Sequence, residues 1–153
     1  GSDGYLYSGS FDNSVRKINP ATGTEVWSFT GHTNTVYALA YGSDGYLYSG
    51  SYDNTVRKIN PATGEQVWSF TGHTGIVRAL AFGGDGYLYS GSVDKTVRKI
   101  DPSNGTQMWS FTGHTATVGA LAFGGGYLYS ASYDKTIRKI NPTNGTQIWS
   151  FTW

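Results

Sequence analysis

The chain has 153 residues with 11 Lys or Arg and 10 Asp or Glu, and this near balance gives no reason to expect a nucleic-acid partner. It has no cysteine, which excludes disulfides and thiolate metal sites, and no apolar run reaches the roughly 18 residues of a membrane span. The 22 Gly, 12 Tyr and 5 Trp are typical of short strands joined by tight turns, so we expect an all-β protein without a membrane partner.

Four strands are predicted in each stretch of about 40 residues. Short runs rich in β-branched and aromatic residues alternate with glycine, proline, asparagine and aspartate, which are typical turn residues. No segment shows the period of an amphipathic helix. In chain order, the strands predicted in one such stretch are residues 46–51 (YLYSGS), 55–59 (TVRKI), 66–70 (QVWSF) and 76–82 (IVRALAF).

The turns between these strands have recognisable chemistry. Asp44-Gly45 suits a tight hairpin, and Asp53-Asn54 can accept backbone N–H groups in an Asx-type turn. Pro61 with Thr63-Gly64 closes the third turn. Because these connections are short, consecutive strands are expected to pair antiparallel.

The whole chain repeats with a period of 41 residues, and the last copy has lost one residue near Gly126. A single four-stranded sheet with apolar residues on both faces must pack against another sheet. Identical sheets that pack with a constant twist curve into a ring, which is a β-propeller; a superhelical stack is the competing closure. The copies are residues 1–41, 42–82, 83–123 and 124–153.

We expect one propeller unit over residues 1–153, with strands named a to d from the axis outward. The chain starts before a b strand, so fifteen strands make three whole blades and one without its inner strand. The expected blades are residues 1–30 (incomplete), 31–71, 72–112 and 113–153.

Part of each copy resembles the WD-repeat propellers. Residues 72–82 (GHTGIVRALAF) followed by residues 90–97 (SGSVDKTV) carry the resemblance. It implies that each Gly-His pair lies between the outer strand of one blade and the inner strand of the next, and that the histidine bonds a serine and the turn aspartate of its own blade. The WD dipeptide itself is absent, being Ile59-Asn60 here. The implied pairs are His32 with Asp53, His73 with Asp94, and His114 with Asp134.

The other part, residues 59–70 (INPATGEQVWSF), is similar to the tryptophan-docking repeat of pyrroloquinoline-quinone-type eight-bladed propellers. In that family the indole lies flat between neighbouring blades, against the following turn. Lysines stand where that family usually has alanine, and a lysine stem over an indole is the expected substitute contact. The docking positions are Trp27, Trp68, Trp109 and Trp149, and the lysines are Lys17, Lys58, Lys99 and Lys139.

Both families usually have seven or eight blades, so four blades are about half of a ring. We therefore predict that two chains join head to tail with C2 symmetry into one eight-bladed ring, because pairing removes unsatisfied blade edges. The near identity of the copies favours a recently duplicated or engineered array.

No catalytic, cofactor or metal site is predicted. The histidines and turn aspartates recur once per blade, so the repeat holds them apart instead of bringing them together. The Arg-Lys pairs, such as Arg57-Lys58, are expected to be solvated strand ends paired with the turn aspartates. A regular chain of this kind offers no non-repeating set of residues for a quinone.

Functional residues are best sought where the copies differ, because positions shared by all copies are explained by the requirements of the fold. The segment after Gly-His-Thr differs most, and Phe11, Tyr52, Val93 and Tyr133 vary as well. We predict a non-enzymatic scaffold that binds a protein or peptide through this face, since aromatic and arginine side chains are the usual anchors of interfaces. A propeller lectin, with sugars between aromatic side chains, is the alternative. The candidate interaction residues are Asn34, Tyr37, Ile76, Arg78 and Thr117.

Overall fold

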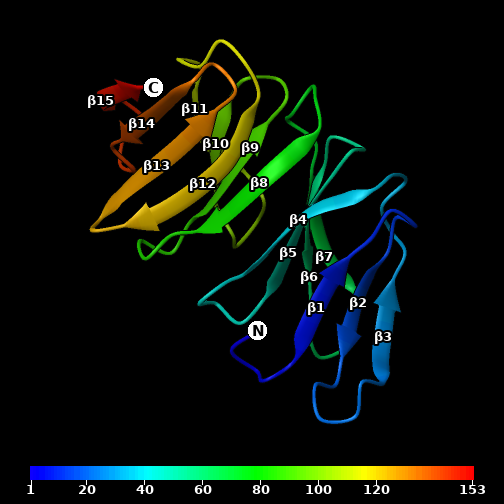
Figure 1. The fold of residues 1–153 in the computed structure, drawn as a ribbon. Coiled ribbons are helices and arrows are strands. Elements are labelled where there is room, and N and C mark those ends of the chain that lie inside the picture. Colours follow the sequence, from blue (N-terminus) through cyan, green and yellow to red (C-terminus); the bar gives the residue numbers. More distant parts are fainter.

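The computed structural model describes all residues 1–153 as fifteen strands in four antiparallel sheets, without a helix (Figure 1). It therefore contains no helix able to cross a membrane. The first sheet comprises β1 (Leu6–Gly9), β2 (Val15–Ile18) and β3 (Glu25–Phe29); the second β4 (Val36–Tyr41), β5 (Leu47–Ser51), β6 (Val56–Ile59) and β7 (Gln66–Phe70); the third β8 (Val77–Phe82), β9 (Leu88–Ser92), β10 (Val97–Ile100) and β11 (Gln107–Phe111); and the fourth β12 (Val118–Gly124), β13 (Tyr127–Ser132), β14 (Thr136–Ile140) and β15 (Gln147–Thr152).

Each sheet is a simple meander, in which every strand pairs with the next one along the chain. The first sheet has the order β1-β2-β3 and lacks the inner strand that the other three have. The predicted all-β propeller architecture, with fifteen strands and one missing inner strand, is confirmed.

The sheets follow one another around a common axis, so the chain forms a sector of a propeller (Figure 1). The inner strands lie side by side, with β8 between β4 and β12, and β1 lies next to β4. Glycine and asparagine allow the tight turns because they tolerate a positive φ. Gly45 has φ +81°, Gly64 has φ +77° and Asn54 has φ 68°.

The core is divided into three hydrophobic clusters, one in each seam between consecutive sheets. The cluster between the second and third sheets contains Tyr48, Val56 and Phe70 from one side, and Val77, Leu88 and Ile100 from the other. Burial of apolar side chains stabilises a sheet only when its neighbour is in place. The other clusters are Val15, Phe29, Val36, Leu47 and Ile59, and Tyr89, Val97, Phe111, Val118, Leu128 and Ile140.

Candidate functional site

Each seam is closed by two donors that share one proline carbonyl of the following sheet. The indole Nε1–H of Trp68 donates to the oxygen of Pro102 at 3.0 Å, and the ammonium of Lys58 donates to the same oxygen at 2.8 Å. The preceding seam repeats this arrangement with Trp27, Lys17 and Pro61, and the following seam with Trp109, Lys99 and Pro142.

The indole also packs against the backbone of the turn that follows this proline. Gly105 has φ +76°, and a Cβ added there would lie 3.0 Å from Cδ2 of Trp68. The glycine therefore provides both the turn conformation and the space for the ring. Gly64 and Gly145 take the same place against Trp27 and Trp109.

The fourth tryptophan and the first turn are left without these partners. Trp149 is 42% exposed and donates to no carbonyl. Gly23, which corresponds to Gly64, has nothing within 4 Å of an added Cβ. The two ends of the array thus carry the two halves of one seam.

The lysines differ from both sequence expectations. Lys58 is buried, not solvated, and its ammonium forms an ion pair with Asp44 at 2.9 Å. The ammonium lies over the ring of Tyr46, 3.9 Å from its centroid, and not over an indole. The arginines do pair with the turn aspartates as expected, since Nη2 of Arg57 lies 3.8 Å from Oδ2 of Asp53.

In the fourth copy, Lys139 has no such carboxylate. Residues 124–126 are all glycine, where earlier copies have the aspartate of their Asp-Gly pair. The Lys139 ammonium lies over the ring of Tyr127, 3.7 Å from its centroid.

Each histidine forms the contacts that the WD-repeat resemblance implies. Nδ1 of His73 lies 2.7 Å from Oδ2 of Asp94, and Nε2 lies 2.7 Å from Oγ of Ser90. Since a carboxylate only accepts, Nδ1 carries the proton and Nε2 accepts from the serine hydroxyl. The backbone N–H of Thr74 donates to the same carboxylate oxygen. His32 pairs with Asp53 and Ser49, and His114 with Asp134 and Ser130.

Burial and these hydrogen bonds determine the charge states. Burial lowers the pKa of His73, which favours the neutral imidazole. Burial raises the pKa of Asp94, but the hydrogen bonds from His73 and Thr96 outweigh it and hold the pKa well below its usual value. The pair is therefore a neutral imidazole bonded to a carboxylate, and it fixes the turn of its own sheet. No cluster of three or more metal-ligating His, Asp or Glu side chains is present.

A row of aromatic side chains and one arginine crosses all four sheets on one face; we call it the aromatic arc. Tyr37 lies between Phe11 and Tyr52, with ring centroids 6.1 and 6.2 Å away. The Arg78 guanidinium lies 5.0 Å from the Tyr37 ring centroid, and its Nη1 donates to the hydroxyl of Tyr133 at 3.1 Å. The arc consists of Phe11, Tyr37, Tyr52, Arg78 and Tyr133.

The aromatic side chains of the arc are accessible to solvent. Phe11 is 80% exposed and Tyr133 is 66% exposed. The Nε of Arg78 is shielded from solvent and has no hydrogen-bond partner. Isolated exposed aromatic side chains are ordinary, whereas this connected row makes the arc the candidate functional site.

The other three candidate interaction residues do not join the arc through their side chains. The backbone oxygen of Asn34 accepts from the Ser51 hydroxyl. Those of Ile76 and Thr117 accept from backbone N–H groups of Val93 and Tyr133. Sequence reasoning did not place Phe11, Tyr52 or Tyr133 in the site, although their variation between copies was the signal that could have found them.

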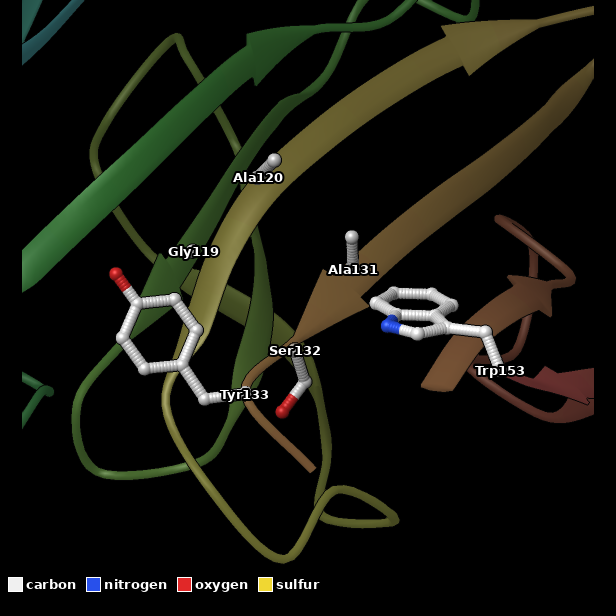
Figure 2. A pocket seen from close by; sticks show the side chains of 6 residues that line it. All are labelled: Gly119, Ala120, Ala131, Ser132, Tyr133 and Trp153. Carbon is white, nitrogen blue, oxygen red and sulfur yellow. The ribbon is translucent and has the colours of Figure 1, made fainter. Parts of the chain in front are cut away.

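The arc ends at a hollow on the fourth sheet, about 260 Å³ in volume. Gly119 stands where the earlier copies have Tyr37 and Arg78, so no side chain fills this place. Figure 2 shows the ring of Tyr133 and the indole of Trp153 on opposite sides of Ser132. The hollow thus extends the aromatic surface toward the chain's last residue.

Comparisons with known proteins agree with this architecture. A family model described as outer membrane protein assembly factor BamB, built on pyrroloquinoline-quinone-type repeats, matches residues 11–72 and 52–153. Among solved structures, one titled "Structure of U3-55K" is similar with a TM-score of 0.90 and 28% identity. The similarity covers 99% of this chain and 49% of that one, so the chain spans about half of its length. None of the curated proteins matches the sequence.

Proposed function

Since the chain belongs to the family described as outer membrane protein assembly factor BamB, we propose that it is a non-enzymatic scaffold whose aromatic arc binds a protein partner. The observation that carries this proposal is the position of Arg78, which joins Tyr37 of one sheet to Tyr133 of another. The family description, an assembly factor, fits a scaffold rather than a catalyst.

The chemistry of the arc suggests what the partner presents. The rings of Phe11, Tyr37 and Tyr52 offer an apolar surface, and Arg78 offers a cation beside the Tyr37 ring. A carboxylate accepts hydrogen bonds from a guanidinium with good geometry. We therefore propose an extended protein segment with an apolar side chain beside an acidic one.

Selection from a displayed peptide library tests this proposal. Peptides selected by the unaltered chain should bind Tyr37→Ala and Arg78→Ala at least tenfold more weakly, because aromatic and arginine anchors dominate interfaces. Val67→Ala, an exposed apolar position on β7, serves as the control and should bind normally. Equal binding by all variants would reject the arc, and selective binding on a glycan array would favour the lectin.

Self-association is a second proposed property, supported by the open halves of a seam at the two ends. We propose that two chains meet head to tail, so that Trp149 and Lys139 of one chain donate to Pro20 of the other and the indole packs on Gly23. This contact would repeat the three internal seams. It would complete the ring of eight sheets predicted from the sequence.

The mass of the particle in solution checks the self-association. Sedimentation should give about twice the 16.5 kDa chain mass at micromolar concentration. Trp149→Ala should shift the mass to that of a monomer, whereas Ile148→Ala, an exposed neighbour on β15, should leave the dimer intact. A monomer mass for the unaltered chain would contradict the proposal.

We also propose that this chain is related to the WD-repeat propellers. It is supported by the histidine, aspartate and serine network in each complete sheet. The near identity of the four copies likewise supports recent duplication or engineering.

A further inference from the structure

The inner edge of β1 differs from that of every other sheet. Leu6 on β1 is 57% exposed, whereas its counterparts Leu47, Leu88 and Leu128 are at most 1% exposed. In the complete sheets an inner strand pairs along this edge, as β4 does with β5. The backbone of β1 therefore presents an unpaired strand edge.

In a complete sheet, the segment leading into the inner strand is also held by polar contacts. In the second sheet, His32 lies between the Asp53 carboxylate and the Ser49 hydroxyl. The Ser51 hydroxyl donates to the backbone oxygen of Asn34. The backbone N–H of Tyr52 donates to the oxygen of Thr35. The third and fourth sheets repeat these contacts.

The first sheet has all the counterparts of these groups, already in place. The turn is formed in the same way, with Ser14 N donating to Asp12 Oδ1 at 3.0 Å as Thr55 N does to Asp53. The corresponding groups are the Asp12 carboxylate, the Ser8 and Ser10 hydroxyls and the Phe11 N–H.

The Asp12 carboxylate shows what replaces the missing histidine. Its Oδ2 accepts from Nη2 of Arg16 at 2.6 Å. In the second sheet the equivalent arginine, Arg57, stays 3.8 Å from Asp53, because His32 occupies that oxygen. An incoming imidazole would displace Arg16 and restore the contact seen in the other sheets.

We propose that the inner edge of β1, with Asp12, Ser8, Ser10 and Phe11, binds an extended segment of a separate polypeptide with the pattern Gly-His-Thr-x-x-Val-x-Ala-Leu-Ala-aromatic. The backbone edge supplies strand pairing, and the Asp12 and Ser8 side chains select the histidine. The three inner strands of this chain define the pattern. A second copy of the chain has no free strand to offer, because β4, β8 and β12 are paired in their own sheets.

A synthetic peptide of residues 71–83 (TGHTGIVRALAFG), labelled for fluorescence anisotropy, tests the proposal. It should bind the full chain saturably with one site per chain. Hydrogen exchange should slow in β1 and not in β13. Replacing the peptide's histidine with alanine should weaken binding roughly ten- to hundredfold, as expected for loss of a hydrogen bond to a charged group.

Matched protein variants distinguish specific binding at the edge of β1 from nonspecific binding of the peptide. Asp12→Asn should weaken binding by a similar factor, while Glu65→Gln, which removes a carboxylate of the second sheet that is bonded to Thr63 away from this edge, should leave it unchanged. Ser8→Ala is the second variant if Asp12→Asn lowers the melting temperature. The proposal is overturned if a peptide of the same composition in scrambled order binds equally well, or if the protection falls outside β1.

Discussion

At the residue scale, the seam concentrates its polar contacts on one carbonyl. The oxygen of Pro102 has two lone pairs, and the indole of Trp68 and the ammonium of Lys58 use both. The Lys58 charge is balanced by Asp44 within its own sheet, so burying it leaves no unpaired ion. The first three sheets thus each balance the charge of the lysine that they donate to the next sheet.

Replacing single docking tryptophans distinguishes the stability contributed by a seam from the stability contributed by the sheet that carries the tryptophan. Trp68→Ala should lower the free energy of unfolding by about 3 kcal/mol, because the ring packs on Gly105 and loses its hydrogen bond. Trp149→Ala, at the same repeat position without an acceptor turn, should cost less than about 1 kcal/mol in the monomer. Chemical denaturation measures both, and equal losses would contradict the docking role.

The histidine network should make stability depend on pH in a fixed direction. The pKa values of His73 and His114 are lowered by burial, so below about pH 6.5 the unfolded chain binds more protons than the folded one. Stability should therefore fall as the pH is lowered from about 6.5, by at most about 1.4 kcal/mol per histidine per pH unit.

The turn aspartates extend this loss at lower pH. The pKa values of Asp53, Asp94 and Asp134 are held low in the folded state, mainly by hydrogen bonds that outweigh burial. Their contribution is present above about pH 4 and is lost as the pH falls below it. Urea titrations at pH 7.5, 6 and 5 test the histidines, and His73→Gln with His114→Gln should flatten the change. A midpoint that stays constant over this range would refute it.

At the element scale, each c–d turn has two tasks that the same glycine performs. It takes up the positive φ that the turn requires, and it leaves room for the indole of the preceding sheet. Gly23 meets only the first requirement, because no indole reaches it. Gly23 therefore serves as a control for Gly64, because it has a similar positive φ without an indole against it.

Alanine at these glycines separates the two tasks. Gly64→Ala and Gly23→Ala both impose a positive φ on alanine, at a cost of about 1 kcal/mol. Gly64→Ala should cost roughly 1–3 kcal/mol more, because its Cβ would meet Trp27 at 2.9 Å. The difference between the two variants in thermal or urea unfolding measures the docking contact, and no difference would argue against it.

Strand positions could be predicted from the sequence because their signals are local. The expected strand at residues 66–70 coincides with β7, and that at residues 76–82 differs from β8 by one residue. Alternating apolar residues and turn residues determine these bounds without reference to the rest of the chain.

The hydrogen-bond acceptor of the Lys58 ammonium could not be predicted from such local signals. Its acceptor, Pro102, lies 44 residues further on, and only the packing of two sheets brings the two together. The aromatic arc was predicted in part: Tyr37 and Arg78 were identified by divergence between copies. Tyr133 joins them through a contact across 55 residues, for which no local pattern exists.

At the scale of the whole molecule, the sheets depend on their neighbours. Each hydrophobic cluster combines residues of consecutive sheets, and none spans the array. Such a protein behaves as a row of units coupled only to the next unit. The two outermost faces, with Trp149 at one end and Gly23 at the other, are where this coupling is incomplete.

The short reach of the seam bonds has a consequence for synthesis. These bonds join residues 33 to 44 positions apart, which is about one repeat. On the ribosome, a sheet can therefore meet its docking partner as soon as one more repeat has left the exit tunnel, long before translation ends. The nascent chain then never holds more than about one repeat of apolar surface waiting for its neighbour.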